Sequence, residues 1–510
     1  MKSTSTNGSS NRADVHSLTH SLWHRDLPVR QQFPPLGGKH RTDVLVVGGG
    51  ITGLTTAIEM AERGYSVTLC EAEAIGAGTT AASTGHLDAH PEMGPRQLVD
   101  KLGLEDARTY VRLRTAAIDR IERFADQVSD FKRIAAYQYS EVDDDIDDLK
   151  QQWESAVGLG LDADWVDSIP ISRARCGYRL NSMARIHIGN YLHRLTELAV
   201  QKNVTIFEGT LVSGITEKET HVLKAGNGEV SFDRVVGAVH CNHTGALILY
   251  AATPPYQSYA IAAHVREDLD DALFWDNSNP YFYVRRANSH DAKLIIAGGC
   301  DHRTGTTDEG NNLRRLEDWL HQRFQVDGIA ATWSAELFEP IDGLPMIGRG
   351  PGKKNAWLAT GLSGVGLTWG TAAAMLIADG IEGKPFALKK QLDPGRTGLS
   401  SPADWLREQA TTTANYAERV LPADRIDTEQ VGEGQGTVGK LDGAHVAFCR
   451  DEDGCEHRLS PICPHMGGVL HFNEVEHTWD CPVHGGRFTA SGKRLYGPPE
   501  SDMNAIDSSD

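Results

Sequence analysis

The chain has 510 residues, of which 40% are hydrophobic and 23% charged, a composition typical of globular proteins at a length that predicts two to four domains. Its 50 Lys and Arg residues against 69 Asp and Glu residues give a formal net charge of −19, which argues against nucleic acid or an anionic membrane as the main partner. No apolar run approaches the roughly 18 residues of a membrane span, and residues 1–21 lack the apolar core of a signal peptide. The cysteines are scattered and do not resemble a disulfide framework. We therefore expect a cytoplasmic protein without a membrane span.

The N-terminal part, residues 1–40, is predicted to be a leader followed by a short docking arm. Its first residues are rich in Ser, Thr and Asn, whereas Trp23, Phe33 and Leu36 are too apolar for a free tail. We expect these apolar side chains to pack onto the domain that follows.

The stretch Asp43–Glu71 contains a strand, a helix and a second strand. The apolar run at 43–47 is typical of a strand buried on both faces, and it stops at a glycine cluster. Apolar residues then recur at helical spacing, and Gly64 suits the end of that helix. The second strand ends at Glu71.

Within this unit Gly48, Gly50 and Gly53 form the pattern G-x-G-x-x-G. The first glycine allows a tight turn, the second lets a pyrophosphate approach the backbone, and the third lets helix and strand pack closely. Glu71 lies eighteen residues after Gly53, near the position of an acid that binds a ribose hydroxyl. A tight structural turn is the alternative, but the strands, the helix and the acid together favour dinucleotide binding.

Small and hydroxylated residues follow in a loop between Gly76 and His86. They suit a backbone against which a cofactor lies closely, although an ordinary loop has a similar composition. His86 and His90 have the spacing of a helical metal-ligand pair, but no third ligand is near, so we expect His86 to line the cofactor pocket. The candidate cofactor contacts in this region are Ile51, Thr52, Ala72, Gly78, Thr79, Thr80, Ser83, Thr84, Gly85 and His86.

The middle of the chain is predicted to contain a helical part and two groups of strands. Residues 100–200 are expected to be mostly helical and charged, and residues 204–239 to return to the first domain as strands. The charged run 141–148 is expected to be a solvated face. Residues 256–299 are rich in aromatic and β-branched side chains, which predicts an antiparallel sheet with a floor for a ligand.

Tyr283 and Arg285 are candidates for binding a substrate. They share a face if 281–285 is a strand, and a phenol beside a guanidinium suits a carboxylate or a similar anion. An exposed Arg beside a core Tyr is an equally open alternative. With His86, these two residues are the catalytic candidates.

A second glycine-lined helix start lies far along the chain. A turn-rich element at 339–348 precedes a short strand and then an apolar helix. The positive end of that helix could stabilise negative charge on a bound cofactor. The candidate contacts here are Gly343, Gly361, Gly364, Gly366, Leu367 and Thr368.

The motifs GGGITG with Glu71, GAGTT, DGLPMIG and ATGLSGVGLT resemble, in order and spacing, the D-amino acid oxidase/glycine oxidase/sarcosine oxidase family over residues 41–397. The resemblance implies an α/β fold, a Rossmann-like FAD domain interleaved with an antiparallel-sheet substrate domain, and hydride transfer to FAD from a carbon next to an amine. Relatives that attach FAD covalently use a cysteine before the proline–aspartate turn or a histidine that His86 does not match, so we expect non-covalent FAD. Thr368 stands where monomeric sarcosine oxidases have a lysine, which argues against a sarcosine-like substrate.

Residues 398–428 are predicted to be a helical connector, and residues 429–510 a separate domain. Cys463 and His465, then Cys481 and His484, form a C-x-H…C-x-x-H arrangement. It resembles the Rieske [2Fe-2S] domain, a small all-β fold in which two thiolates hold one iron and two imidazoles the other. A Cys2His2 zinc site is the alternative, but zinc sites usually pair cysteine with cysteine and histidine with histidine.

The surroundings of these ligands suggest a low reduction potential. Neither loop has a cysteine for the disulfide of high-potential Rieske proteins, and Gly486 replaces a serine that donates to the cluster in them. Backbone N–H groups of Gly467, Gly468, Gly485 and Gly486 are expected to point at the sulfurs. We expect a potential in the lower part of the Rieske range of roughly −150 to +300 mV.

The order of the two domains resembles a bacterial group of FAD-dependent oxidoreductases with a C-terminal Rieske domain. FAD takes electrons in pairs and releases them singly, whereas the cluster takes one at a time. We therefore expect a dehydrogenase that oxidises a small amine or amino-acid-like substrate and passes electrons through the cluster to an external acceptor. The sequence contains neither a second nucleotide-binding pattern for NAD(P)H nor the iron-site pattern of a Rieske oxygenase. An amine oxidase that uses O2 with a structural cluster, and a non-catalytic redox sensor, are the alternatives.

Overall fold

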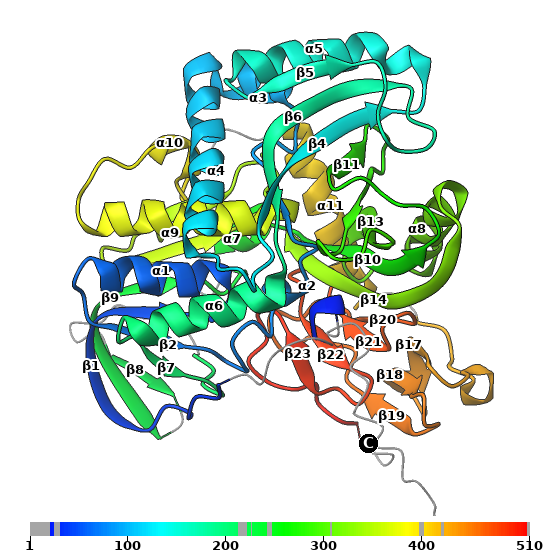
Figure 1. Cartoon of the computed structure of the whole chain (residues 1–510). Helices are drawn as coiled ribbons and strands as arrows, with labels where there is room; N and C mark the ends of the chain where they lie inside the picture. The colour runs from blue at the N-terminus through cyan, green and yellow to red at the C-terminus, as the bar shows by residue number, and fades with distance from the viewer. Residues whose placement is uncertain are drawn as a thin grey trace, which may run out of the picture.

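The computed structural model describes residues 21–24, 31–212, 222–225, 227–241, 247–306, 309–396, 402–419 and 423–506. In these ranges the chain forms two large sheets, the helices around them and a smaller all-β part at the C-terminus (Figure 1). Most of the expected leader, parts of the expected connector and the last four residues lie outside the described residues.

The first sheet is mostly parallel and has the order β15-β16-β9-β1-β2-β7, with β8 beside β9. Parallel pairing of β1 with both β2 and β9 confirms that the chain returns to this sheet after a long excursion. The strands are β1 (Gly38–Val47), β2 (Val67–Cys70), β7 (Thr205–Phe207), β8 (Val222–Ala225), β9 (Gly228–Gly237), β15 (Met346–Arg349) and β16 (Ala356–Thr360).

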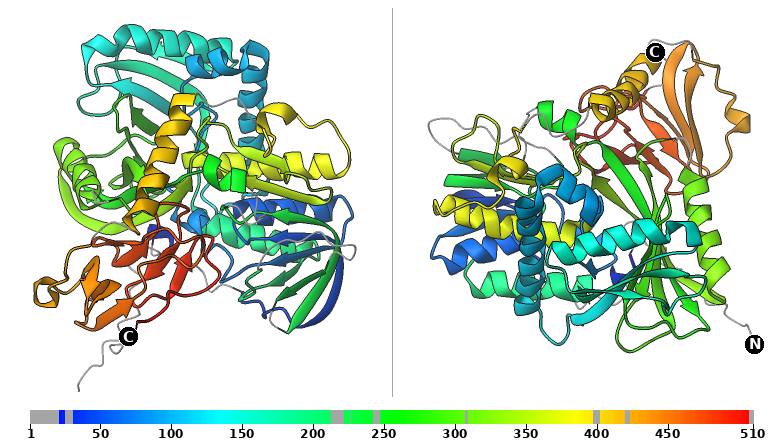
Figure 2. Two further views of the ribbon diagram at one scale, coloured as in Figure 1. Left: turned by 180° about the vertical axis from the view of Figure 1, so that it is seen from behind. Right: turned by 90° about the horizontal axis from the view of Figure 1, so that it is seen from above.

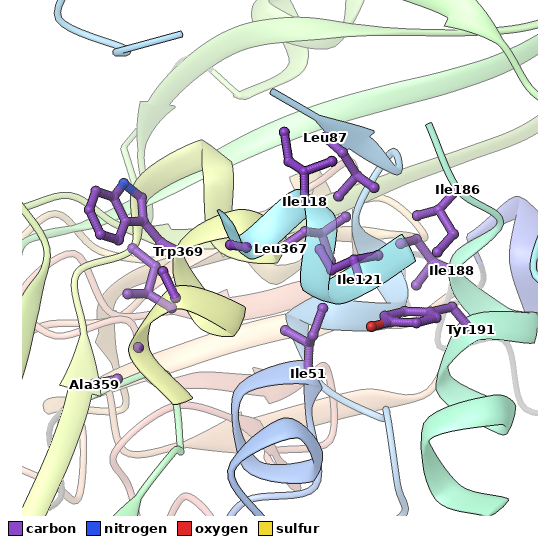
Figure 3. Packing of buried hydrophobic residues seen from close by; sticks show 14 of the residues in the cluster. Ile51, Leu87, Ile118, Ile121, Ile186, Ile188, Tyr191, Ala359, Leu367 and Trp369 are labelled. Atoms are coloured by element: carbon purple, nitrogen blue, oxygen red, sulfur yellow. The ribbon is translucent and has the colours of Figure 1, made fainter. Parts of the chain in front are cut away.

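Helices from distant parts of the sequence pack together beside this sheet. In Figure 3, Ile51 of α1, Ile121 of α4, Tyr191 of α6 and Leu367 of α9 gather in one apolar core. Removal of this surface from water holds the interleaved segments together. The helices are α1 (Ile51–Glu62), α2 (Thr79–Ala82), α3 (Pro95–Leu102), α4 (Leu104–Phe124), α5 (Ile146–Gly158), α6 (Ile188–Gln201), α7 (Leu247–Ala252), α8 (Glu309–Arg323), α9 (Gly366–Ile381), α10 (Lys389–Leu392) and α11 (Pro402–Glu418).

The second sheet has the order β14-β10-β13-β12-β11-β4-β6-β3, with β5 beside β6, and only β11 and β4 pair in parallel among its described neighbours. The antiparallel sheet predicted at 256–299 is confirmed. The strands are β3 (His86–Leu87), β4 (Lys132–Ser140), β5 (Ala163–Val166), β6 (Cys176–Arg185), β10 (Pro255–Val265), β11 (Leu273–Asp276), β12 (Phe282–Arg286), β13 (Leu294–Arg303) and β14 (Val326–Phe338).

The prediction that residues 100–200 are mostly helical was wrong for β4, β5 and β6. In β4 the partly exposed and the buried residues alternate along 133–137, the pattern of a strand with one face in the core. The charged residues Lys132 and Arg133 at the start of the strand obscured this period in the sequence.

The C-terminal part contains two small antiparallel sheets, β17-β18-β19 and β20-β21-β22-β23, which lie beside both large sheets (Figure 2). Helix α11 packs against it, because the Asn415 side chain donates to Val469 O and accepts from Val469 N–H, each at 2.9 Å. The strands are β17 (Gln435–Leu441), β18 (Ala444–Arg450), β19 (Glu456–Leu459), β20 (His471–Asn473), β21 (Thr478–Asp480), β22 (Arg487–Thr489) and β23 (Arg494–Tyr496).

The N-terminal arm and the apolar stretch Ser363–Ile381 can be compared with what the sequence predicted. Trp23, in the described piece of the N-terminal arm, is only 1% exposed, so the predicted docking of this side chain is confirmed.

The helical stretch Ser363–Ile381 has the length and composition of a membrane span, but 67% of its most apolar window is buried inside the protein, as in core helices.

Candidate functional site

A cavity of about 830 Å³ lies between the two large sheets. Its wall includes the start of α1, the loop that follows β2, the ends of β13 and β14, and the loop before α9. Residues 494–497 of the C-terminal part complete the wall. Three parts of the fold therefore meet at one cavity.

The N-terminus of α1 opens into this cavity. Gly50 precedes the helix and has no side chain with which to cap it, and Thr80 Oγ1 accepts from the Ile51 N–H at 3.2 Å. A Cβ at Gly53 would lie 1.9 Å from the carbonyl oxygen of Gly48, so this close helix–strand contact requires glycine. The N–H groups of a first turn have no partners within their helix, and here they suit a phosphate group.

Glu71 holds the glycine turn in place at the end of β2. Its Oε2 accepts from Gly49 N–H at 2.6 Å, and its Oε1 accepts from Glu73 N–H at 3.0 Å. Burial raises the pKa of Glu71, and the two backbone hydrogen bonds oppose that rise. Because Glu71 also lines the cavity, it is placed where a ribose hydroxyl could donate to it.

Two tryptophans fix the loop that carries the hydroxylated residues. Trp333 Nε1 donates to Ala82 O and Trp23 Nε1 donates to Ser83 O, both at 2.7 Å. These bonds tie the loop to β14 and to the N-terminal arm, so its small side chains face the cavity as a fixed surface.

Most of the predicted cofactor contacts line the cavity. Those that do are Gly48, Gly50, Ile51, Thr52, Glu71, Ala72, Gly78, Thr79, Thr80, Ser83, Thr84, His86, Gly343, Gly364, Gly366 and Leu367. Gly53, Gly85, Gly361 and Thr368 lie behind this wall instead, and Thr368 Oγ1 donates to Val365 O within the start of α9. The positive end of α9 was predicted to stabilise charge on the cofactor; in the loop before that helix, Gly364 N–H donates to Glu92 Oε1 at 3.0 Å.

His86 and Tyr283 lie side by side in the cavity wall. Their rings meet edge to face, with centroids 4.9 Å apart. His86 Nδ1 is 3.0 Å from Thr84 Oγ1, and His86 Nε2 is buried with no partner among the described residues. Burial and the charge of Arg285 keep the pKa of His86 well below its usual range, so the imidazole is neutral.

Arg285 does not reach the cavity, and the prediction that it binds a substrate anion was wrong. Its side chain is fully buried, and its donors go to the backbone carbonyl oxygens of Thr84, Ile186, Arg286 and Ala287. The alternation of β12 does place it on the same face as Tyr283. All N–H groups of the Arg285 side chain, however, donate to these carbonyl oxygens, so Arg285 supports the cavity wall from behind.

The sequence predictions missed seven carboxylates among the described residues that line the cavity. They share no sequence pattern and are Glu73, Asp88, Glu92, Asp148, Asp276, Asp301 and Glu339. Burial raises the pKa of Glu92 to about 7 and that of Glu339 to about 8, and repulsion by Asp301 adds to both shifts. Arg114, which is fully buried, donates to Asp88 Oδ1 at 2.7 Å, and its charge also opposes the rise in the pKa of Glu92.

The predicted cluster ligands lie on two loops with the same backbone geometry. Gly467 N–H donates to Cys463 O and Gly485 N–H donates to Cys481 O, both at 3.0 Å, and both glycines have positive φ. The two cysteine thiols are within hydrogen-bonding range of each other. The imidazole rings of His465 and His484 meet edge to face, with centroids 5.2 Å apart.

This arrangement fits a binuclear cluster. A Cβ at Gly468 would lie 2.9 Å from Cys481 Sγ, and a Cβ at Gly486 would lie 3.4 Å from Cys463 Sγ, so glycine leaves room around the sulfurs. No group of three His, Cys, Asp or Glu side chains in the described ranges is placed around a single ion, as a zinc site requires. Burial lowers the pKa of His484 to about 3, which keeps its ring in the neutral form that binds metal.

The donors to the sulfurs differ from the prediction. The N–H groups of His465 and Met466 bond to the Cys463 thiol, and those of Val483 and His484 bond to the Cys481 thiol. The N–H groups of Gly467 and Gly485 are occupied by carbonyl oxygens, because each loop turns back on itself at glycine.

The histidine end of the cluster loops is covered by the first part of the chain. The ring of Tyr250, in α7, lies 5.0 Å from that of His465 and 4.8 Å from that of His484. Arg303, at the end of β13, donates to Pro482 O through Nε and Nη2, both at 3.1 Å. The cluster loops therefore face the large domain.

Comparisons with known proteins agree with both halves. Residues 43–380 match the family described as FAD dependent oxidoreductase, and residues 423–507 match the Rieske [2Fe-2S] domain. YhfW of Bacillus subtilis (strain 168), described as a Rieske 2Fe-2S iron-sulfur protein, is 28% identical over 499 residues, which cover 94% of this chain and 96% of YhfW.

Two named enzymes match the larger part of the chain. Glycine oxidase of Geobacillus kaustophilus (strain HTA426) is 22% identical over 71% of this chain and 99% of the oxidase. The crystal structure of glycine oxidase from Geobacillus kaustophilus covers 70% of this chain and 100% of its own, with a TM-score of 0.57 and 21% identity. Gamma-glutamylputrescine oxidoreductase of Escherichia coli (strain K12) is 24% identical over 69% of this chain and 86% of that enzyme.

These matches confirm the predicted family, the α/β fold with a small C-terminal Rieske domain, and the two cofactors. The cavity at the glycine-lined start of α1 suits FAD, and the paired loops suit a [2Fe-2S] cluster. The match at 43–380 covers more than half of the chain, so the protein belongs to the FAD-dependent oxidoreductase family and carries a C-terminal Rieske [2Fe-2S] domain.

Proposed function

We propose that the protein is a dehydrogenase that oxidises a C–N bond of a small amine or amino-acid-like substrate and delivers single electrons to an external acceptor. When bound, FAD supplies a two-electron acceptor for the hydride, and the cluster supplies a one-electron outlet. The residues described above would hold both groups and exclude water from the space between them.

The observation that carries this proposal is the shared cavity wall. Arg494, Leu495, Tyr496 and Gly497 of the Rieske domain line the same space as the glycine turn of the FAD domain. A Cβ at Gly497 would lie 2.1 Å from the carbonyl oxygen of Gly485, next to the ligand His484. The domain that holds the cluster thus touches the cofactor cavity directly, which supports a short path for electrons.

The choice of a C–N bond is supported by relatives and by the proton-accepting groups of the cavity. Glycine oxidase and gamma-glutamylputrescine oxidoreductase are named for substrates with C–N bonds. An amine must lose its proton before hydride leaves the neighbouring carbon. Glu92, with a pKa raised to about 7, could accept such a proton near neutral pH.

We further propose that FAD is bound without a covalent link. Cys70 and Cys241 line the cavity, but burial raises the pKa of each thiol to about 12, so neither is a reactive thiolate. Acid precipitation of the holoenzyme should release all of the flavin into the supernatant. We also place the protein in the cytoplasm, a location supported by the lack of any disulfide among its eight cysteines, of which Cys463 and Cys481 would hold the cluster.

Anaerobic stopped-flow mixing with a panel of amines and amino acids tests the proposed function. We expect bleaching of the flavin followed by the EPR signal of a reduced cluster. The matched variant is Tyr250→Leu, which removes the ring that contacts both cluster histidines and leaves the cavity wall intact. It should slow the second phase more than the first.

The two alternatives give different results in the same experiment. An O2-using oxidase would bleach without any cluster reduction and would reoxidise rapidly in air. A redox sensor would show no bleaching with any amine or amino acid. Either result would overturn the electron path proposed here.

A further inference from the structure

The part of the cavity lined by Tyr281 and Tyr283 contains an excess of acidic groups. Glu92, Asp301 and Glu339 reach it from three different elements. A Cβ at Gly364 would lie 3.1 Å from Glu92 Oε1 and 3.7 Å from the Tyr281 hydroxyl, so these two groups converge above the loop before α9. Tyr281 donates in turn to Asp301 Oδ2 at 3.2 Å.

Cationic side chains do not balance these acids. Arg494 is the one Lys or Arg side chain among the described residues that line the cavity. It lies on the Rieske side, where it donates to Pro499 O and Gly497 O and approaches Glu73 at 3.8 Å. Arg114 already pairs with Asp88, and Arg285 is bonded to backbone carbonyl oxygens behind the wall. A substrate carboxylate placed here would meet acidic side chains and no Lys or Arg side chain of the described wall, whereas a bound cation would hold these acids in their charged form.

The wall also has features that suit an organic cation. Asp301 Oδ1 is buried and has no hydrogen-bond partner in the described part of the chain, so an acceptor is left open. Trp275, Tyr281 and Tyr283 add aromatic faces to the same cavity, and such faces attract ammonium groups. The acids are not grouped around a single point as ligands of a metal ion are, within the residues described.

We propose that the substrate is a diamine or polyamine, whose second amino group stays charged and binds among Glu92, Asp301 and Glu339. This inference rests on the proposed function and specifies its substrate class. The nitrogen next to the oxidised carbon must be neutral when hydride leaves, so it cannot compensate the carboxylates. A second ammonium group, several bonds away, can do so throughout the reaction.

The electron and proton balance needs no further reactant. The reacting ammonium group first gives one proton to Glu92, and the second ammonium group stays beside the carboxylates of Asp301 and Glu339. Hydride then leaves the carbon with both electrons of the C–H bond, with FAD as its acceptor, and the nitrogen lone pair forms the C=N bond of an iminium product. Water hydrolyses that product to an aldehyde and an ammonium ion.

Three compounds with four-carbon chains separate the possibilities in anaerobic bleaching of the holoenzyme. 1,4-Diaminobutane carries a second cation, butylamine carries no second charge, and 4-aminobutanoate carries a carboxylate. We expect a second-order rate constant for 1,4-diaminobutane roughly 100-fold above that for 4-aminobutanoate, because the acidic side chains of the described wall would attract a second ammonium group and repel a carboxylate. Equal rates, or faster bleaching by 4-aminobutanoate, would overturn the substrate class.

Isosteric variants show which side chains cause the preference for the diamine. Asp301→Asn and Glu92→Gln should each reduce the preference for the diamine by roughly tenfold, the size expected for loss of one charged contact. Asp318→Asn removes an exposed carboxylate on α8 and should leave the preference unchanged. If the two cavity variants keep the wild-type preference, these acids do not bind the second amino group.

A binding measurement keeps the inference separate from the proposed function. Tetramethylammonium has no lone pair to drive hydride loss, so its binding can be followed as a shift of the flavin absorption spectrum without turnover. We expect it to bind, acetate not to bind, and Asp301→Asn to weaken the cation. Acetate binding without tetramethylammonium binding would refute the cation site, even if amines bleach the flavin. Absence of bleaching by every compound would refute the dehydrogenase, while tetramethylammonium would still decide the nature of the site.

Discussion

The hydroxyl of Tyr496, in the last strand of the Rieske domain, lies 3.2 Å from the hydroxyl of Thr79 in the loop that lines the FAD cavity. Thr79 Oγ1 also donates to Glu336 O at 3.0 Å. The Tyr496 hydroxyl lies 2.5 Å from Nδ1 of His240, whose pKa burial lowers to about 4, so that this neutral ring can accept its proton. Gly497 then packs against Gly485 in the second cluster loop. One side-chain contact and one turn of backbone thus separate the cavity wall from the cluster ligands.

Tyr496→Phe should loosen this contact while the ring still packs beside Gly78. Loss of one hydrogen bond would cost about 1 kcal/mol of stability. We expect cluster reduction to slow relative to the wild type after anaerobic mixing with substrate, as measured by freeze-quench EPR. Tyr65→Phe, in the turn after α1, is the matched control. An unchanged rate of cluster reduction in Tyr496→Phe would show that electrons take another route.

Arg285 should act on stability and not on substrate affinity. Arg285→Met leaves several buried carbonyl oxygens without donors, which should lower the free energy of unfolding by about 3 kcal/mol. Denaturant unfolding followed by tryptophan fluorescence measures this loss. Holoenzyme that remains folded should keep the wild-type KM. A large rise in KM with unchanged stability would restore the role that the sequence suggested.

Glu71→Gln should weaken FAD binding. An amide can accept only through its oxygen, so one of the N–H bonds from Gly49 and Glu73 is lost, and with it part of the support of the glycine turn. We expect the Kd for FAD to rise roughly tenfold, equivalent to about 1.4 kcal/mol. Titration of the apoprotein with FAD, followed by quenching of flavin fluorescence, gives this value. Glu62→Gln, at the other end of α1, should bind FAD as the wild type does.

The sequence predicted those parts of the fold whose backbone geometry is determined by residues close together in the chain. The glycine turn with Glu71, and the loops of Cys463 and Cys481, depend on backbone geometry that few residue types allow, so their sequence is informative. The acidic group could not be found in this way, because Glu92, Asp301 and Glu339 converge only after the second sheet forms. Arg285 was misread for the same reason, since strand alternation gives its face but not the carbonyl oxygens that meet it.

The cavity acids predict an unusual dependence of stability on pH. The pKa of Glu92 is raised to about 7 and that of Glu339 to about 8, chiefly by burial, with Asp301 and each other as nearby like charges. Arg114 and the Gly364 N–H oppose the shift at Glu92, and Asp88 and Glu408 add to the negative surroundings. The folded protein therefore binds more protons than the unfolded chain between about pH 4.5 and pH 8.

Stability from these two groups should be present below pH 4.5 and lost as pH rises through 7 and 8. Scanning calorimetry of the holoenzyme between pH 6 and 9 should show a falling Tm, and Glu339→Gln should flatten the fall. A bound cation needs the charged carboxylates, so tetramethylammonium should bind more tightly as pH rises over the same range. A Tm that rises from pH 6 to 9, or cation binding that weakens, would contradict the assignment.

The cluster is predicted to have a low reduction potential. The cysteines in the Rieske domain are free, so no disulfide links its two cluster loops, and glycine stands at position 486 with its Cα hydrogen toward Cys463. Fewer donors to the sulfurs leave more electron density on the cluster, which disfavours reduction. Redox titration followed by EPR should give a midpoint in the lower part of the range from roughly −150 to +300 mV. Gly486→Ser should raise that midpoint, because it adds a hydroxyl donor. It is combined with Pro499→Ala, since a Cβ at Gly486 would lie 2.6 Å from the Pro499 ring. Pro499→Ala alone is the control, and a wild-type midpoint near the upper limit would mean that other donors dominate.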